Sequence, residues 1–102
     1  MSTFAMLTRV STEIARTPHM LEELEQRAME HIRSTCPQVK WLHSYALLGP
    51  YDYLDIFTAP DIATATKVST LIRTYGRSHS EVWPATEWSE FKAMLKGLAP
   101  AA

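Results

Sequence analysis

Four short segments of the chain are rich in β-branched, aromatic and other apolar residues, a composition typical of β-strands. They span residues 3–10, 39–48, 53–59 and 79–85. Pro84 lies in the last segment and cannot donate a backbone hydrogen bond, so we expect that strand at an edge of its sheet.

A helical pattern separates the first two strands. Its apolar residues recur at four-residue spacing, at Met20, Leu24, Ala28 and Ile32. Thr17 is a candidate N-cap, and Pro18 suits the first helical position. Cys36-Pro37 ends the pattern. This spacing predicts a helix over residues 17–34, reached through a polar connection at 11–16.

A second helix is predicted between the third and fourth strands. Pro60 and Asp61 mark its beginning and Gly76 its end. Its apolar face consists of Ile62, Ala65, Val68, Ile72 and Tyr75. After the last strand, Thr86 is a candidate cap for a short third helix, which precedes a loose tail at 99–102.

The element order is therefore β-α-β-β-α-β with a C-terminal helix. Right-handed crossovers turn this order into a ferredoxin-like α+β sandwich, an antiparallel sheet with two helices on one face. The 102 residues suit a single domain, over 1–102.

Alternation along the strands divides their side chains between the two faces of the sheet. The smaller aliphatic set is predicted under the helices: Ala5, Leu7, Leu42, Ala46, Leu54, Ile56 and Val82. The larger set is predicted on the uncovered face: Phe4, Met6, Thr8, Trp41, His43, Tyr45, Tyr53, Asp55, Phe57, His79, Glu81 and Trp83. Such an apolar face exceeds what monomers usually expose, so we expect a second copy of the chain to cover it by two-fold symmetry. Alternatively, the C-terminal helix folds across it with Trp88, Phe91 and Leu95, and the two arrangements can coexist.

Composition narrows the range of partners. Hydrophobic residues make up 46% and charged residues 21% of the chain, and its net charge is −1. There is no basic excess to bind nucleic acid, no apolar run long enough to span a membrane, and no secretory signal pattern at the N-terminus. The single cysteine, Cys36, excludes an internal disulfide and fits the cytoplasm.

Four ionisable residues of the uncovered set are the candidates for chemistry: His43, Asp55, His79 and Glu81. Two imidazoles and two carboxylates could hold a divalent transition metal such as zinc, iron or manganese. His43, Asp55 or His79 could instead act as a base on a small organic substrate. In the plainest interpretation, each group only hydrogen-bonds to its neighbours. A one-residue slip of the hairpin would place His43 and Asp55 on opposite faces.

Aromatic residues of the same set would line a ligand site: Trp41, Tyr45, Tyr53, Phe57 and Trp83. They fit packing or interface roles equally well. Asp52 follows Gly49-Pro50 in a turn, where we expect it to accept hydrogen bonds from nearby backbone N–H groups.

The segments "GPYDYLDIFTAPD" and "SHSEVWPATEWSEF" resemble the GYD domain family, named for a Gly-Tyr-Asp signature that here is Gly49-Pro50-Tyr51-Asp52. The resemblance implies a dimeric α/β barrel, in which two ferredoxin-like units close their sheets against each other. It implies no catalytic residues. We therefore expect a non-catalytic homodimer, able to associate further, that binds a small ligand or a partner at the barrel. The alternatives are a cofactor-independent enzyme similar to dimeric-barrel monooxygenases and isomerases, or a metal-binding protein.

Overall fold

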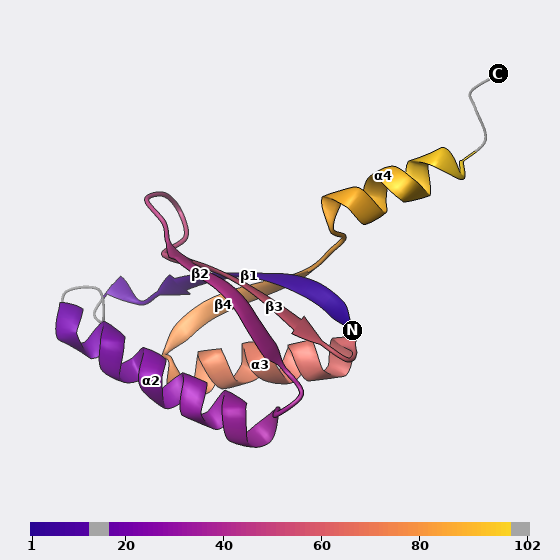
Figure 1. Cartoon of the computed structure of the whole chain (residues 1–102). Coiled ribbons are helices and arrows are strands. Elements are labelled where there is room, and N and C mark those ends of the chain that lie inside the picture. The colour runs from indigo at the N-terminus through magenta and orange to yellow at the C-terminus, as the bar shows by residue number, and fades with distance from the viewer. Residues whose placement is uncertain (13–16, 99–102) are drawn as a thin grey trace.

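The computed structural model describes residues 1–12 and 17–98 and has the predicted element order (Figure 1). Its elements are β1 (Ser2–Val10), α2 (Pro18–Thr35), β2 (Lys40–Ala46), β3 (Tyr53–Ala59), α3 (Ile62–Tyr75), β4 (Ser78–Ala85) and α4 (Trp88–Lys96). Most of the predicted connection at 11–16 and the whole tail at 99–102 lie outside the described residues. The ferredoxin-like α+β fold is confirmed.

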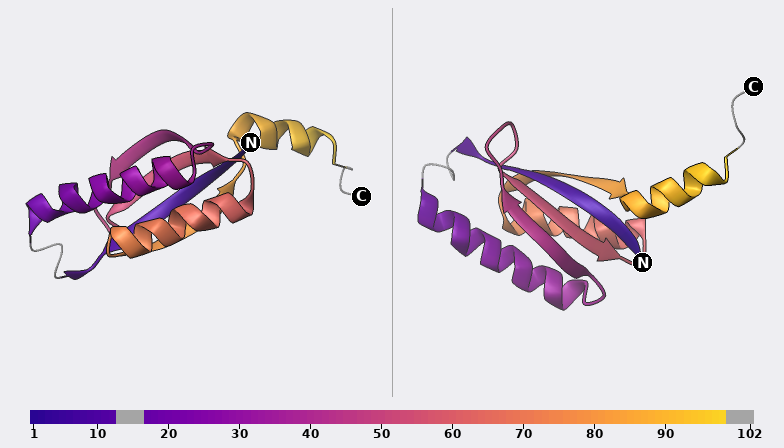
Figure 2. Two further views of the ribbon diagram at one scale, coloured as in Figure 1. Left: turned by 90° about the horizontal axis from the view of Figure 1, so that it is seen from below. Right: turned by 45° about the horizontal axis from the view of Figure 1, so that its top comes forward.

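The four strands form one antiparallel sheet in the order β2-β3-β1-β4. Strand β4, which contains Pro84, lies at an edge as predicted. Helices α2 and α3 run side by side on one face of the sheet, and the opposite face carries no helix of the described chain (Figure 2).

The helix termini agree with the predictions in part. Asp61 caps α3, and its carboxylate accepts a hydrogen bond from the Thr64 backbone N–H over 2.7 Å. Thr17 holds the N-cap position of α2, but its side chain makes no capping hydrogen bond. The N-cap of α4 is Glu87 rather than Thr86. The carboxylate of a glutamate can accept hydrogen bonds from the same backbone N–H groups as a threonine hydroxyl. Its negative charge also interacts favourably with the positive end of the helix dipole.

The predicted assignment of the sheet faces is wrong for β1 and β3 and for Trp41 of β2. Phe4, Met6 and Phe57 are buried under the helices, with exposed fractions of 2%, 0% and 0%. The helices meet the sheet through small residues such as Ala28 and Ala65, so large side chains on the strands fill the space between the layers. Trp41 stacks on Phe57 with ring centroids 5.2 Å apart, and Phe57 stacks on Phe4 at 5.6 Å.

The centre of the uncovered face is nevertheless apolar. Strand pairing places Ala5 beside Ile56 and Trp83, and Leu7 beside Leu54 and Glu81. From β2, His43 lies next to Ile56, and Tyr45 next to Leu54. We call this surface the open face. Its residues are Thr3, Ala5, Leu7, Arg9, His43, Tyr45, Leu54, Ile56, Thr58, His79, Glu81 and Trp83.

Helix α4 does not fold across the open face. It extends beyond the end of β4, away from the rest of the molecule (Figures 1 and 2). Trp88 and Leu95 are 66% and 46% exposed. The radius of gyration is 16.0 Å, compared with about 13 Å for a compact chain of this length. None of the described helices is long and apolar enough to cross a membrane.

Candidate functional site

A cavity of about 310 Å³ lies between α2 and the sheet. Its α2 side is formed mainly by the apolar residues Leu21, Leu24, Ala28 and Met29. Its sheet side contributes the polar residues Thr8, Ser44, Tyr53 and Asp55, together with Trp41. An apolar cavity with a few polar groups on one wall is typical of a small-molecule site, and this volume is near the lower end of the usual range.

Asp55 is the charged group of the sheet wall. Its Oδ1 accepts hydrogen bonds from the Ser44 hydroxyl at 2.7 Å and from the Trp41 indole N–H at 3.1 Å, and the same indole N–H also donates to Ser44 Oγ at 2.8 Å. Burial raises the pKa of Asp55, while the hydrogen bonds from Ser44 and Trp41 oppose that rise. Both of its hydrogen bonds to described residues reach Oδ1, which leaves Oδ2 available to another donor.

Thr8 provides a second unused polar group in the cavity. Only 4% of Thr8 is exposed, and its Oγ1 has no hydrogen-bond partner among the described residues. Thr8 pairs with Tyr53 across the sheet, while Asp55 pairs with Met6, so Thr8 and Asp55 are diagonal neighbours on adjacent strands. A buried hydroxyl without a partner is costly, and this one is enclosed by protein atoms, so Thr8 lowers stability without offering its Oγ1 to a ligand.

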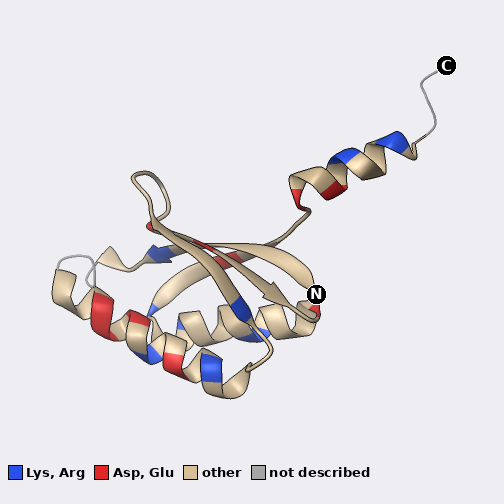
Figure 3. Ribbon diagram, viewed as in Figure 1, with Lys and Arg blue, Asp and Glu red and all other residues tan. Residues whose placement is uncertain are grey.

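The charges around the cavity are negative. Glu22 and Glu25 of α2 join Asp55 in the lining, and no lysine, arginine or histidine takes part among the described residues. Figure 3 shows both acidic and basic residues along α2, and of these Glu22 and Glu25 line the cavity. Burial raises the pKa of Tyr53, and the charges of Asp52, Glu25 and Asp55 add to the effect. The phenol of Tyr53 therefore lies in a negative potential, which would disfavour an anionic ligand.

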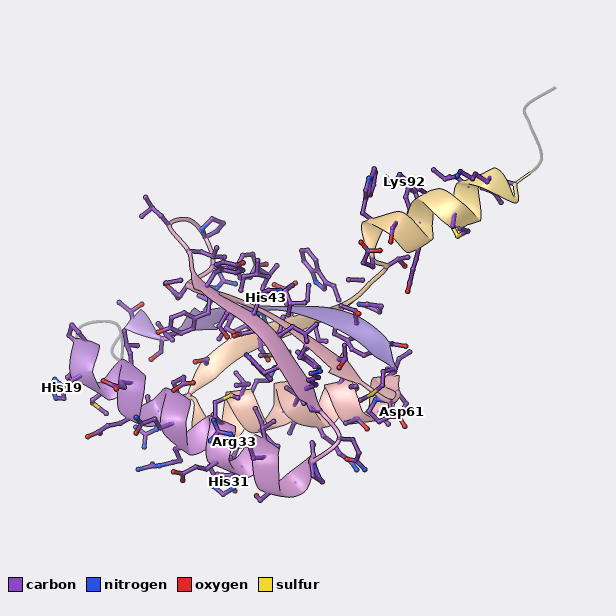
Figure 4. All side chains as sticks on the ribbon, in the orientation of Figure 1. His19, His31, Arg33, His43, Asp61 and Lys92 are labelled. Atoms are coloured by element: carbon purple, nitrogen blue, oxygen red, sulfur yellow. The ribbon has the colours of Figure 1, made fainter. Side chains whose placement is uncertain are left out.

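The predicted partners His43 and Asp55 lie on opposite faces of the sheet. A β-bulge between Trp41 and His43 shifts the register of β2, so that His43 pairs with Ile56 while Asp55 pairs with Ser44. The extra residue of a bulge reverses the alternation that follows it. His43 accordingly lies on the side of the sheet opposite α2, which carries His31 and Arg33 (Figure 4).

The four candidate metal ligands therefore do not converge. His43, His79 and Glu81 lie on the open face and Asp55 lies under the helices. His79 Nε2 is 3.7 Å from Glu81 Oε2, which forms a local ion pair when the histidine is protonated. In the part of the chain that the structure describes, no three histidine, cysteine, aspartate or glutamate side chains are grouped closely enough to hold a metal ion.

The aromatic candidates are divided between three environments. Trp41 and Tyr53 line the cavity, and Tyr45 contributes to its edge while 55% exposed. Phe57 is fully buried in the core, and Trp83 lies on the open face with half of its surface exposed.

The Gly49–Asp52 turn is held by contacts with β1 and β4. Asp52 Oδ2 accepts a hydrogen bond from the Val10 backbone N–H at 2.9 Å, and the Asp52 N–H donates to the Thr8 carbonyl at 2.8 Å. Asp52 thus accepts a hydrogen bond from a backbone N–H as predicted, but the donor belongs to β1, so the bond ties the hairpin to that strand. The Tyr51 hydroxyl donates to Glu81 of β4. Of the signature residues, Tyr51 therefore connects the turn to β4, and Asp52 connects it to β1.

Sequence reasoning missed Thr8 and Ser44 as members of the site. Thr8 follows Phe4 and Met6 at two-residue spacing on a face that proves to be the buried one. The Thr8 hydroxyl among apolar residues of this face could have indicated a site, because polar groups in a core normally need hydrogen-bond partners. Ser44 gave no comparable signal, since its position depends on the bulge.

The sequence profile of the GYD domain matches residues 4–95, nearly the whole chain. The chain belongs to the GYD domain family. This GYD domain is also similar to two solved structures. One is the crystal structure of TTHA0845 from Thermus thermophilus, at 21% identity and a TM-score of 0.54, covering 85% of this chain and 95% of the other.

The second is the crystal structure of the hypothetical protein PHS023 from Pyrococcus horikoshii, at 19% identity and a TM-score of 0.52. It covers 85% of this GYD domain and 92% of that chain. Likenesses at this level of identity support the fold alone. No curated protein matches the sequence.

Proposed function

We propose that this GYD domain binds a small, largely apolar ligand in the cavity between α2 and the sheet, without transforming it. The observation that carries the proposal is the cavity itself, which the protein's own aromatic residues leave unfilled. A module that only contacts macromolecules would be expected to fill such a volume, because cavities reduce stability.

A neutral, apolar fluorescent dye, N-phenyl-1-naphthylamine, tests this proposal. We expect its fluorescence to rise on binding to the protein. The rise should be much smaller in Ala28→Leu, which adds side-chain volume to a cavity-lining position. Ala63→Leu, at an exposed position of α3, is the matched control. If Ala28→Leu remains folded by circular dichroism and binds the dye as the wild type does, the cavity is not the site.

We further propose that the protein acts as a homodimer joined through the open face. Its accessible surface is 7141 Å², whereas about 5,800 Å² is usual for a folded monomer of 11.6 kDa. The difference between these two accessible areas is larger than the roughly 800 Å² that each partner buries in a standard interface. The apolar residues at the centre of the open face and the separated helix α4 would both supply contact area.

Light scattering of Trp83→Lys tests the dimer. Trp83 is 50% exposed, so the change should leave the monomer folded but place a charge in the proposed interface. We expect dimer affinity to fall at least tenfold, as for a central interface aromatic. The control is Ile62→Lys, since Ile62 is 69% exposed on α3 and away from the open face. A wild-type monomer at micromolar concentration would exclude the dimer.

A cofactor-independent enzyme is the second candidate, favoured by the raised pKa of Asp55 inside an apolar cavity. Asp55 would be its base, and His43 and His79 would take no part because they project from the opposite face. Nuclear magnetic resonance of a bound ligand over hours distinguishes the two functions, because an enzyme would consume the ligand.

A further inference from the structure

Two side-chain oxygens of the cavity wall lack a hydrogen bond among the described residues, and of these only Asp55 Oδ2 is accessible to a ligand. Thr8 Oγ1 is buried without a partner in the described structure, and Asp55 Oδ2 receives no hydrogen bond from the described residues. The Trp41 N–H and the Ser44 hydroxyl both hold Oδ1. The carboxylate is therefore fixed in orientation while one oxygen remains free for a ligand.

The sign of the ligand's charge follows from the lining. Asp55, Glu22 and Glu25 contribute carboxylates, and basic residues are absent from the described lining. An organic acid would meet the part-buried carboxylate of Asp55 inside the cavity, and the exposed carboxylates of Glu22 and Glu25 would add to the repulsion. A cation would compensate the desolvated carboxylate of Asp55 and would also be attracted to the faces of Trp41 and Tyr53.

The number of donors points to an ammonium group. A primary ammonium carries three N–H donors, so it can bind Asp55 Oδ2 and still donate to water. An alcohol could donate to Asp55, but it would leave the charge of the carboxylate uncompensated. The apolar residues of α2, Leu21, Leu24, Ala28 and Met29, would enclose the hydrocarbon part of the ligand.

We propose that the ligand of this cavity is a small primary amine with a single ring or a short alkyl chain, bound as its ammonium cation at Asp55. This assignment rests on the proposed ligand-binding function, because it specifies the chemistry of the same cavity.

Three ligands of similar size and different charge test the assignment: 2-phenylethylamine, 2-phenylethanol and phenylacetate. We measure their binding to the full chain by titration calorimetry at pH 7. The amine should bind at least tenfold more tightly than the alcohol, and phenylacetate should bind most weakly. Asp55→Asn should remove the preference for the amine and retain binding of the alcohol. The control is Asp61→Asn, an exposed carboxylate outside the cavity, which should preserve the preference.

The outcomes separate the two proposals. Equal or tighter binding of the alcohol or of phenylacetate overturns the amine assignment, and so does an amine preference that persists in Asp55→Asn. The proposed cavity function would survive either result. If none of the three ligands binds, the amine assignment fails, and the dye experiment with Ala28→Leu then decides whether the cavity binds any apolar ligand.

Discussion

The indole N–H of Trp41 donates a hydrogen bond to Asp55 Oδ1 over 3.1 Å, and it does so across a β-bulge that begins at Trp41 itself. The bulge brings Ser44 opposite Asp55, so that the serine hydroxyl also reaches Oδ1. A local irregularity of an edge strand thereby positions the carboxylate of the cavity.

Asp55→Asn should stabilise the empty protein at neutral pH. Burial raises the pKa of Asp55 above its value in the unfolded chain. Between the unfolded and the raised pKa the folded state binds more protons, so its stability falls as the pH rises. The melting temperature of Asp55→Asn should therefore exceed that of the wild type at pH 7. This difference should shrink as the pH falls through the raised pKa of Asp55 towards the ordinary aspartate pKa of about 4. Thermal unfolding at several pH values measures this difference.

Asp61→Asn is the control, because it should show the opposite sign. The Thr64 side chain and backbone donate to Asp61 and lower its pKa. The carboxylate therefore contributes stability at neutral pH that is lost as the pH falls through the lowered pKa. If both variants change stability in the same direction at pH 7, the explanation given for Asp55 is wrong.

Thr8→Val should also stabilise the empty protein, by about 1 kcal/mol. The two side chains have nearly the same shape, and the substitution removes a buried hydroxyl that has no partner among the described residues. Urea unfolding measures the change. Thr66→Val is a control with the same chemistry, because the Thr66 hydroxyl is exposed and bonded to the Ile62 carbonyl at 2.9 Å. A loss of stability in Thr8→Val would mean that the hydroxyl is satisfied in the folded protein.

Asp52→Ala should destabilise the fold by about 1–3 kcal/mol, because the Val10 N–H loses a charged acceptor. Asp52→Asn keeps an acceptor oxygen at that place and should cost less. Denaturant unfolding of both variants compares them. Equal losses would show that the negative charge, rather than the hydrogen bond to Val10, holds the hairpin against β1.

Gly76→Ala should destabilise the end of α3. A Cβ atom on Gly76 would lie 2.6 Å from the Ile72 carbonyl oxygen, which belongs to the helix backbone and cannot move freely. The next residue, Arg77, has a φ of 49°. Arg77→Gly should therefore relieve strain and stabilise by up to about 1 kcal/mol. The two melting temperatures should move in opposite directions from that of the wild type.

Periodicity in the sequence was sufficient to predict the helices, the strands and their order along the chain. Leu24, Ala28 and Ile32 are buried as the spacing at four residues predicted, and Gly76 ends α3. The faces of β1 were not predictable in the same way, because both of its alternating sets are apolar and only the packing volume under the helices selects Phe4 and Met6. The bulge after Trp41 left no recognisable pattern, and the candidate site depends on it.

The hairpin between β2 and β3 is closed at its base, where the Leu47 N–H donates to the Asp52 carbonyl at 2.8 Å. Leu48 beyond that closure is fully exposed, and a Cβ atom on Gly49 would meet no other atom within 4 Å. Extra residues inserted between Leu48 and Gly49 should leave the register of β2 and β3 unchanged. This tip is thus a suitable position for a grafted peptide or a spectroscopic label, which would report on the protein without touching the cavity.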